Sequence, residues 1–594
     1  MTTLVADALV ERLRTWGIHR IFGYSGDGID PILGALNRAG GDPELVTARH
    51  EESAAFMATA DAKWTGGTGC CLATHGPGAI PLLNGLYDAK LDKKPVVAII
   101  AQQHLTALGS GYQQEIDART LFKDVCSAYL QTVTTPEQLH LVLDRAVRTA
   151  QASRSPTCVI IPHDVQQLEM PDALPHTHGV VTSSVGWAPP RVIPPDEAID
   201  AAVRVLDSGQ RVAILAGQGA AGAADELVAV ADRLGAGVAK ALLGKAVLPD
   251  DLPFVTGAVG HLGTTASEFL MQGCDTLLMV GTNEPYTEFL PPPGQARGVQ
   301  IDIDGRNLGS RYPTEVNLAG DATETLRALL PRLAQRDRSA WRGRVEEAVA
   351  DWWRIAERRA HRPADPLNPQ LLFHELSPRL PDDALLAVDV GSVTYWYARH
   401  IRMRGCMAGH LSSTLASMGS AMPYAVAAKC AYPDRLVVAL AGDGAMQMNG
   451  INELITVGRM WRTWDDPRLP VLVLDNGDLN EVTWEQREME GDPMFPASQQ
   501  VTSLPYADYA QLLGLHGTVV HSPEGVVPAW EAALSADRPF LIHAVVDPAV
   551  PLLPPRLEPS MKDKLFAGLD QETTELAARA RSLVLAELAD QEES

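Results

Sequence analysis

Two hydrophobic patterns alternate along the chain: short apolar runs, which are typical of buried strands, and amphipathic stretches, which are typical of helices. The N-terminal stretch predicts a helix that Gly17 can end, with an apolar face formed by Val5, Leu9, Leu13 and Trp16. Apolar runs of strand length follow at 95–100, 157–161, 212–215, 436–442 and 470–475. Strands that are apolar on both faces belong to parallel sheets covered by helices, so this alternation predicts an α/β fold.

These elements fall into three blocks, each of which predicts a doubly wound, Rossmann-like domain with a parallel sheet. We predict domains over 1–175, 196–335 and 366–550, and a helical tail over 551–594. Prolines are frequent in the segment 171–195, which predicts a linker between the first two domains. Polar and charged residues dominate 335–366, which predicts a second, helical connector.

Composition and charge narrow the class of protein. The chain has 594 residues, 46% hydrophobic and 21% charged, which is typical of a soluble globular protein with several domains. No apolar run is long enough to span a bilayer, and the N-terminus carries Asp7 and Glu11, unlike a signal peptide. The seven cysteines form no CxxC pair, which favours a reducing cytoplasm. The net charge of −24 argues against nucleic-acid binding.

Two of the apolar strands end on polar residues. The first ends on Gly442-Asp443-Gly444 and the second, after a crossover, on Asp475-Asn476. The carboxyl ends of parallel strands are where open α/β sheets bind ligands, and carboxylate and amide oxygens suit Mg²⁺. Backbone amides after the glycines can hold a diphosphate. Taken alone, the first segment is equally well explained as a glycine-rich turn capped by an aspartate.

These strand ends resemble the metal and diphosphate motif of thiamine diphosphate (ThDP) enzymes, a GDG sequence followed by an asparagine. Further motifs of these enzymes occur in the family's order: RHEESAAF at 49–56, THGPGAIPLLNGLYD at 74–88, GSGYQQE at 109–115, DVGS at 389–392 and ASMGSAMP at 416–423. Over residues 3–550 the chain resembles pyruvate oxidases and pyruvate:quinone dehydrogenases, which are related to acetohydroxyacid (acetolactate) synthases. Asp475 departs from the usual Asn-Asn pair, and the separation of Asp443 and Asn476 is longer than usual.

The resemblance implies a role for each matching residue. The metal ligands would be Asp443, Asn476 and the main-chain carbonyl of Asp478. Glu51 would be the carboxyl group beside N1′ of the aminopyrimidine, where protonation activates the cofactor. Without a cofactor, Glu51 or Glu52 is a helix-start acid favoured by the helix dipole. The further ThDP contacts implied are Gly391, Ser392, Ala416, Ser417, Met418, Gly444, Ala445, Leu479, Asn480, Glu481 and Val482.

Within that set, Met418 would be the apolar wedge under the bent cofactor, and the carbonyl of Ala416 would accept from the 4′-amino group. Met418 is otherwise an ordinary core methionine. Ala416 replaces a more usual glycine.

The middle block resembles flavin-contacting segments of the same oxidases at 257–263, 278–286 and 300–304. The implied FAD contacts are Ala258, Val259, Gly260, His261, Gly281, Thr282, Asn283, Glu284 and Pro285, with Asp302 at the ribose and Asp321 near the adenosine end. The sequence GQGAAG at 217–222 is weak evidence for dinucleotide binding, and ordinary strand–helix packing accounts for it equally well.

Four features depart from a simple pyruvate oxidase. Gln113 replaces the phenylalanine of GSGYFQE, Glu481 aligns with the family's mobile active-site phenylalanine, and His75 replaces a small residue. Gln114 and Glu485 match polar positions of the oxidases, and Glu485 is a candidate proton carrier. These side chains either change the fate of the substrate or point to solvent and satisfy one another. The tail ends ELADQEES, and this acidic end disfavours docking to an anionic membrane.

The combined motifs predict an enzyme that contains ThDP, Mg²⁺ and FAD and decarboxylates a short 2-oxo acid, pyruvate before others. The enamine would be oxidised through FAD, with a quinone or another compound as electron acceptor. A carboligase of the acetolactate synthase type is the alternative, with FAD structural or absent. A non-catalytic regulatory protein that binds the cofactor is a third hypothesis, which Glu51, Asp443 and Asn476 disfavour. The resemblance implies a homodimer or homotetramer, with Glu51 and Asp443 of one site on different chains.

Overall fold

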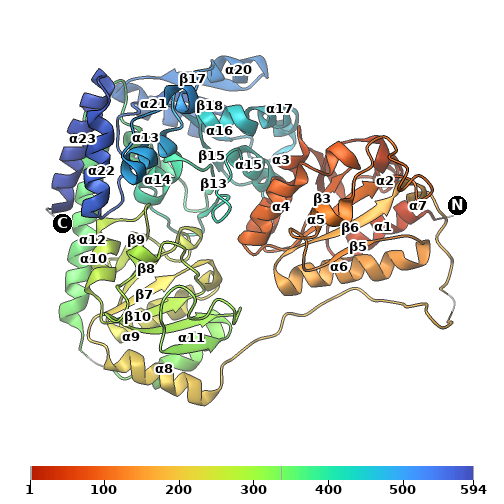
Figure 1. Ribbon diagram of the computed structural model, residues 1–594, viewed down its shortest axis with the longest axis horizontal. Coiled ribbons are helices and arrows are strands. Elements are labelled where there is room, and N and C mark those ends of the chain that lie inside the picture. The colour runs from red at the N-terminus through yellow and green to blue at the C-terminus, as the bar shows by residue number, and fades with distance from the viewer. Residues whose placement is uncertain (1–2, 175, 336, 593–594) are drawn as a thin grey trace.

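The structure is a computed structural model that describes residues 3–174, 176–335 and 337–592. Within these residues the chain forms three sheets of six strands, and all pairings between their strands are parallel (Figure 1). The predicted α/β fold with three Rossmann-like sheets is confirmed. We call the parts built on these sheets the N-terminal, central and C-terminal units. The limits proposed above for the domains stay a prediction.

The N-terminal unit has the strand order β2-β1-β3-β4-β6-β5. Its strands are β1 (Arg20–Gly23), β2 (Glu44–Thr47), β3 (Gly69–Ala73), β4 (Val96–Gln102), β5 (Leu130–Thr132) and β6 (Pro156–Pro162). Its helices are α1 (Val5–Thr15), α2 (Asp30–Arg38), α3 (Glu51–Thr65), α4 (Leu82–Leu91), α5 (Ala118–Phe122), α6 (Leu139–Ser153) and α7 (His163–Gln166). The helix predicted at the N-terminus is confirmed as α1, and its apolar face is buried.

Strand β4 shows why this sheet is covered on both sides. All of its residues are buried. Val96, Ala98 and Ile100 belong to one hydrophobic cluster, which includes α3 and α4, whereas Val97 and Ile99 belong to another, which includes α1 and α6. Successive side chains of a strand point to opposite faces, so an uninterrupted apolar run requires helices on both.

The central unit has the strand order β12-β11-β10-β7-β8-β9. Its strands are β7 (Val212–Ala216), β8 (Gly237–Lys240), β9 (Val255–Ala258), β10 (Thr276–Val280), β11 (Arg297–Asp302) and β12 (Val316–Ala319). Its helices are α8 (Asp196–Ser208), α9 (Ala224–Leu234), α10 (Thr265–Gly273) and α11 (Ala322–Leu329).

The C-terminal unit has the strand order β14-β13-β15-β16-β18-β17, the same connectivity as the N-terminal unit. Its strands are β13 (Leu385–Val388), β14 (Ala408–His410), β15 (Val437–Gly442), β16 (Pro470–Asp475), β17 (His516–Val520) and β18 (Phe540–Val545). Its helices are α13 (Pro369–Leu376), α14 (Ser392–His400), α15 (Ala421–Ala431), α16 (Asp443–Ala445), α17 (Ile451–Met460), α18 (Asn480–Glu485), α19 (Pro496–Gln499), α20 (Tyr506–Leu512) and α21 (Pro523–Leu534).

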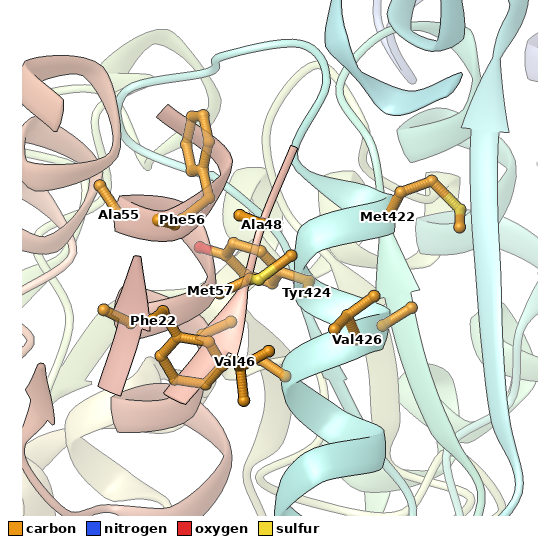
Figure 2. Packing of buried hydrophobic residues seen from close by; sticks show 14 of the residues in the cluster. Phe22, Val46, Ala48, Ala55, Phe56, Met57, Met422, Tyr424 and Val426 are labelled. Atoms are coloured by element: carbon orange, nitrogen blue, oxygen red, sulfur yellow. The ribbon is translucent and has the colours of Figure 1, made fainter. Parts of the chain in front are cut away.

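The N-terminal and C-terminal units share one hydrophobic core. Helix α3 packs against α15, and buried side chains of both units belong to the same cluster. Figure 2 shows Phe22, Val46 and Met57 of the first unit facing Tyr424 and Val426 of α15. This interface brings the start of α3 next to the loop that precedes α15.

Two connectors and a tail complete the chain. The segment 171–195 forms no helix or strand in its described residues, and it runs as a long strap between the N-terminal and central units (Figure 1). The predicted helical connector is confirmed as α12 (Ser339–Ala360), and the predicted helical tail as α22 (Pro559–Asp570) and α23 (Glu575–Glu592). Over the described part of the chain, no helix has the length and apolarity needed to cross a bilayer.

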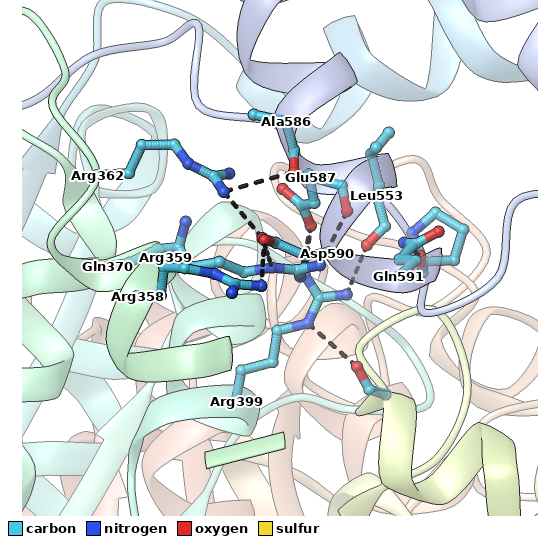
Figure 3. Close-up of polar contacts among 12 residues, drawn as sticks. Arg358, Arg359, Arg362, Gln370, Arg399, Leu553, Ala586, Glu587, Asp590 and Gln591 are labelled. Atoms are coloured by element: carbon cyan, nitrogen blue, oxygen red, sulfur yellow. Dashed lines mark hydrogen bonds and ion pairs between the residues drawn. The ribbon is translucent and has the colours of Figure 1, made fainter. Parts of the chain in front are cut away.

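The acidic end of the tail packs against α12 (Figure 3). Arg359 of α12 donates to Glu587 Oε1 at 2.8 Å and to Asp590 Oδ2 at 3.0 Å. Arg358 and Arg362 also donate to Asp590, at 2.6 and 2.9 Å. Both carboxylates are buried. Acidic residues of the tail therefore have arginine partners within the chain.

Candidate active site

The two strand ends singled out by the sequence lie side by side. Strands β15 and β16 are neighbours, with Gly442 opposite Leu474. Asp443 follows β15, and its carboxylate accepts the backbone N–H of Gly444 and of Gly477, both at 2.8 Å. The loop after β16, which carries Asn476, is thereby tied to the loop after β15. The predicted ligands Asp443 and Asn476 thus lie on adjoining loops, and their roles stay a prediction.

The two aspartates at this edge of the sheet differ in their pKa shifts. Burial, together with the neighbouring Asp475, raises the pKa of Asp443 to about 7. Burial alone would also raise the pKa of Asp475, but hydrogen bonds from His543, at 2.7 Å, and from Ser503 bring it below its usual value. Asp475 therefore has side-chain hydrogen-bond partners in His543 and Ser503, whereas the Asp443 carboxylate accepts from the two backbone N–H groups. A buried carboxylate of this kind fits a bound divalent cation.

The side chain of Asp478 is used inside the loop. Its Oδ1 accepts from the Thr483 hydroxyl at 2.7 Å, and its Oδ2 accepts from the Asn480 amide at 3.1 Å. This arrangement agrees with the predicted use of its main-chain carbonyl, rather than its carboxylate, as a metal ligand. It also gives Asn480, a predicted ThDP contact, a structural role in the same loop.

Open space adjoins two glycines at the carboxyl edge of this sheet. A Cβ atom built on Gly442 or on Gly391 would meet nothing within 4 Å. Gly391 has φ +118° and precedes Ser392, the first residue of α14. Backbone that faces open space beside Asp443 fits a diphosphate held by amide N–H groups. The residues present therefore fit ThDP and Mg²⁺.

Three loops of the C-terminal unit converge at Met418. A Cβ built on Gly444 would lie 3.4 Å from Met418 Cε and 2.7 Å from Leu479 Cδ2. Asp389, which follows β13, holds the Met418 loop, because its carboxylate accepts the N–H groups of Gly419 and Ala421 at 2.8 and 3.0 Å. The predicted ThDP contacts of these loops are thus brought together.

Two residues near the site hold backbone conformations that L-residues rarely adopt. Ala416 has φ +56° and Gln114 has φ +64°. Such strain persists only where the surroundings enforce it, and it is concentrated at functional sites. Ala416 explains why glycine is the more usual residue at its position.

The start of α3 lies against this group of loops. Glu51 is the first residue of α3, as predicted, and its Oε1 lies 3.1 Å from a Cβ built on Gly78. Asn84 donates to Glu52 Oε1 at 2.5 Å and to the Ser417 hydroxyl at 2.8 Å. Glu52 therefore links α3 to the Met418 loop, which leaves Glu51 as the better candidate for the cofactor carboxylate.

The unusual residues His75 and Gln113 both contact Gln103 but differ in burial. His75 is buried, and its Nε2 lies 3.2 Å from Gln103 Nε2. The same Gln103 nitrogen donates to the main-chain carbonyl of Gln113 at 2.7 Å, whereas the Gln113 side chain is exposed. For Gln113 the structure favours the interpretation that the side chain points to solvent.

Acidic residues line one face of α18 and the turn that follows it. Burial, then the charge of Glu485, raises the pKa of both Glu481 and Glu488 to about 7. Glu488 is buried, and its Oε1 has no hydrogen-bond partner among the described residues. Sequence reasoning missed Glu488, although its seven-residue spacing from Glu481 places both on one helical face. Val482, a predicted ThDP contact, is 49% exposed.

The central unit faces this acidic helix through the loop after β10. Burial raises the pKa of Glu284 to about 7. Burial, then the negative charges of Glu481 and Glu284, also raises the pKa of Tyr286. Next to this loop, His261 packs its ring against Tyr286 at 4.9 Å between ring centroids. The segments that resemble flavin contacts therefore border the same region as α18.

Of the two aspartates predicted to contact the nucleotide end of FAD, one fits that role better than the other. Asp302 ends β11, and its carboxylate accepts from the backbone of Asp304 at 2.8 Å, which leaves further acceptor capacity for ribose hydroxyls. Asp321 is instead the N-cap of α11 and accepts from Glu324 N at 3.1 Å. A Cβ built on Gly217 would lie 2.4 Å from the Gly281 carbonyl oxygen. The glycine-rich turn at 217–222 therefore permits close backbone packing, which favours ordinary packing over dinucleotide binding as its explanation.

Comparisons with known proteins agree with this geometry. Three family models match: "Thiamine pyrophosphate enzyme, N-terminal TPP binding domain" at residues 3–121, the central domain at 199–329 and the C-terminal TPP binding domain at 389–544. The chain is 33% identical to "Putative thiamine pyrophosphate-containing protein YdaP" of Bacillus subtilis (strain 168), over 92% of both chains.

Two further relatives carry more specific names. The chain is 32% identical to "Acetolactate synthase isozyme 2 large subunit" of Escherichia coli (strain K12), covering 93% of this chain and 97% of that one. It is 28% identical to "Pyruvate oxidase" of Lactiplantibacillus plantarum, covering 92% of this chain and 89% of that one.

Proposed function

Because the chain belongs to the thiamine pyrophosphate enzyme family, we propose that it decarboxylates a short 2-oxo acid, pyruvate before others, with Mg²⁺ as the metal. As a member of this family, the protein is a ThDP-dependent enzyme that acts on 2-oxo acids. The observation that carries the proposal is the convergence of Gly444, Leu479 and Met418, next to the start of α3.

Each group of residues has a defined task. ThDP supplies an electron sink for the loss of CO₂. Asp443, Asn476 and the carbonyl of Asp478 would hold Mg²⁺, and backbone N–H groups near Gly391 and Gly442 would hold the diphosphate. Met418 would support the cofactor from one side.

Glu51 would hold or release a proton at its carboxyl oxygen beside the pyrimidine ring. The Gly76–Gly78 turn lies next to this carboxylate, since a Cβ built on Gly78 would lie 3.1 Å from Glu51 Oε1. Such a proton-transfer role contributes about 10²–10⁴-fold to rate in enzymes.

We propose oxidation through FAD as the fate of the two-carbon product, with FAD bound by the central unit. Asp302 supports this proposal, because it stands at the carboxyl end of β11 with acceptor capacity for a ribose. We also propose that the protein is a homodimer or homotetramer. Exchange of N-terminal units between chains would place Glu51 and Asp443 of one site on different subunits, and the long strap 171–195 would accommodate it.

Carboligation is the second candidate, because the wall formed by α18 is acidic. Glu481 stands where oxidases have an apolar residue, and Glu488 lies behind it. A polar wall suits a second carbonyl substrate that needs a proton when the new bond forms. The relative named as an acetolactate synthase supports this candidate as well.

A matched pair of variants tests the role of Glu51. We expect Glu51→Gln to lower product formation from pyruvate by about 10²-fold or more, because glutamine cannot exchange a proton. Glu52→Gln is the control, since it changes the adjacent residue and keeps an oxygen for Asn84. Equal activity of Glu51→Gln and the wild type would refute the proposed mechanism.

Product analysis separates the two candidates. The purified protein is incubated with pyruvate, with and without a quinone or dye as electron acceptor. Acetate that depends on the acceptor supports oxidation, whereas acetolactate supports carboligation. A colourless protein that releases no flavin on denaturation would refute the oxidase proposal.

A further inference from the structure

A buried cluster of charges lies at the interface of the N-terminal and C-terminal units. Its centre is Lys63 of α3, whose side chain is fully buried. The ammonium donates to Asp88 Oδ1 at 3.2 Å, to Asp92 Oδ2 at 2.6 Å and to the hydroxyl of Tyr424 at 2.6 Å. The Tyr424 hydroxyl in turn donates to Asp88. We call these four side chains the Lys63 network.

This network reaches the loop that carries Ala416 and Met418. Lys63 also donates to the carbonyl of Leu411 at 2.8 Å. The Asp92 carboxylate accepts the N–H groups of Ser413 and Thr414, at 3.2 and 3.0 Å. The loop 411–418 belongs to the C-terminal unit, but Lys63, Asp92 and Asn84 of the N-terminal unit hold it at four points.

The loop needs such support. Ala416 has φ +56°, a conformation that costs an L-residue about 1–2 kcal/mol, so the loop would relax if its partners were removed. Removing one member of the network while the units stay docked would leave a buried charge without its partner, which is costly. Tyr424 also belongs to the hydrophobic cluster that the two units share (Figure 2).

We propose that the Lys63 network is a positioning device, which keeps the loop 411–418 in its cofactor-binding conformation only while the N-terminal unit is docked. The inference rests on the proposed function, because it assumes that this loop contacts ThDP. It assigns a role to residues that touch neither cofactor nor substrate. Lys63, Asp88, Asp92 and Tyr424 are therefore positioning residues, and their loss acts through the loop.

The test uses Asp92→Asn in the full-length protein, with two readouts. Hydrogen exchange of the amides of Ser413 and Thr414 is measured without cofactor, and the dissociation constant of ThDP is measured by calorimetry in the presence of Mg²⁺. We expect both to rise about tenfold, because the asparagine loses charge-assisted hydrogen bonds. Tyr424→Phe, which removes one hydroxyl, should cause a smaller change of the same kind.

Asp144→Asn is the matched control. Asp144 is equally buried and pairs with Arg12 at 2.6 Å inside the N-terminal unit, away from the interface. Asp144→Asn should lower the stability of the protein without a selective rise in hydrogen exchange at the amides of Ser413 and Thr414. If Asp92→Asn and Tyr424→Phe leave these two amides exchanging as in Asp144→Asn, the positioning role is wrong. A wild-type protein that does not bind ThDP would refute the proposed function, while the exchange experiment would still decide the role of the network.

Discussion

Replacing Arg359 by methionine should loosen the C-terminal tail from α12. The buried guanidinium bonds Glu587 and Asp590 of α23, at 2.8 and 3.0 Å (Figure 3). Methionine fills much of the same volume, but both buried carboxylates lose this cation. Leaving a buried charge without its partner costs more than the pair contributes, so the variant should be destabilised.

The size of the destabilisation depends on the arginines that still pair with Glu587 and Asp590. Breaking a buried ion pair costs about 3–5 kcal/mol. Asp590 keeps Arg362 at 2.9 Å and Arg358 at 2.6 Å, and Glu587 keeps Arg399 at 4.0 Å. These partners place the expected loss at the lower end, about 3 kcal/mol. A loss of this size multiplies the population in which α23 is detached by roughly a hundred.

Amide hydrogen exchange of α23 measures this opening directly. Arg358→Met is the matched control on the same helix, because its side chain is 49% exposed and should contribute about 1 kcal/mol or less. Similar exchange of α23 in the two variants would refute the reasoning.

Acid should have the same effect as the substitution. Burial raises the pKa of Asp590, but the charge of Arg359 and its hydrogen bond outweigh burial and lower it. A lowered folded pKa stabilises the tail above the unfolded value of about 3.9, and the stabilisation is lost as the pH falls through the folded pKa. Exchange of α23 should therefore rise below about pH 4 in the wild type, and less so in Arg359→Met.

Three further predictions concern single residues. Ala416→Gly should stabilise the protein by about 0.5 kcal/mol in urea unfolding, because glycine tolerates φ +56° but costs entropy on folding; a clear loss of stability would contradict this. The pKa of Glu488 is raised to about 7, so its contribution to stability should fall as the pH rises from about 4.3 to 7. Glu488→Gln should remove this contribution, gaining about 2 kcal/mol over the wild type at pH 8 and less at pH 5 in denaturant titrations; an equal difference at both pH values would contradict this. Native protein should react rapidly with a thiol reagent at the exposed Cys406, since burial raises the pKa of Cys70 and Cys430 to about 12; an unchanged fast phase in Cys406→Ser would disprove this.

Elements that depend on local pattern were predictable from the sequence. The runs 436–442 and 470–475 are strands because they are apolar, short and ended by glycine or aspartate. Their parallel pairing follows from the crossover between them, and it places Asp443 and Asn476 on adjoining loops. The start of a helix at Glu51 follows in the same way from a strand ending just before it.

Contacts between distant parts of the chain were not predictable. Lys63 and Tyr424 are separated by more than half of the sequence, and neither local charge nor periodicity shows that they pair. The arginine partners of the acidic tail are hidden for the same reason. Asp321 is different, because its spacing from Glu324 before an apolar run already indicated a helix cap. Family resemblance directed attention to a flavin contact at that position and away from the local signal.

The equal connectivity of the first and third sheets means that the chain contains two like folds. Helix α3 follows β2 and precedes β3, just as α15 follows β14 and precedes β15, so the two units meet through equivalent helices. Glu51 is the first residue of α3, and Met418 lies in the loop that precedes α15. The predicted acid and the predicted apolar support thus come from two like folds that meet at one interface, and a single cofactor would need both.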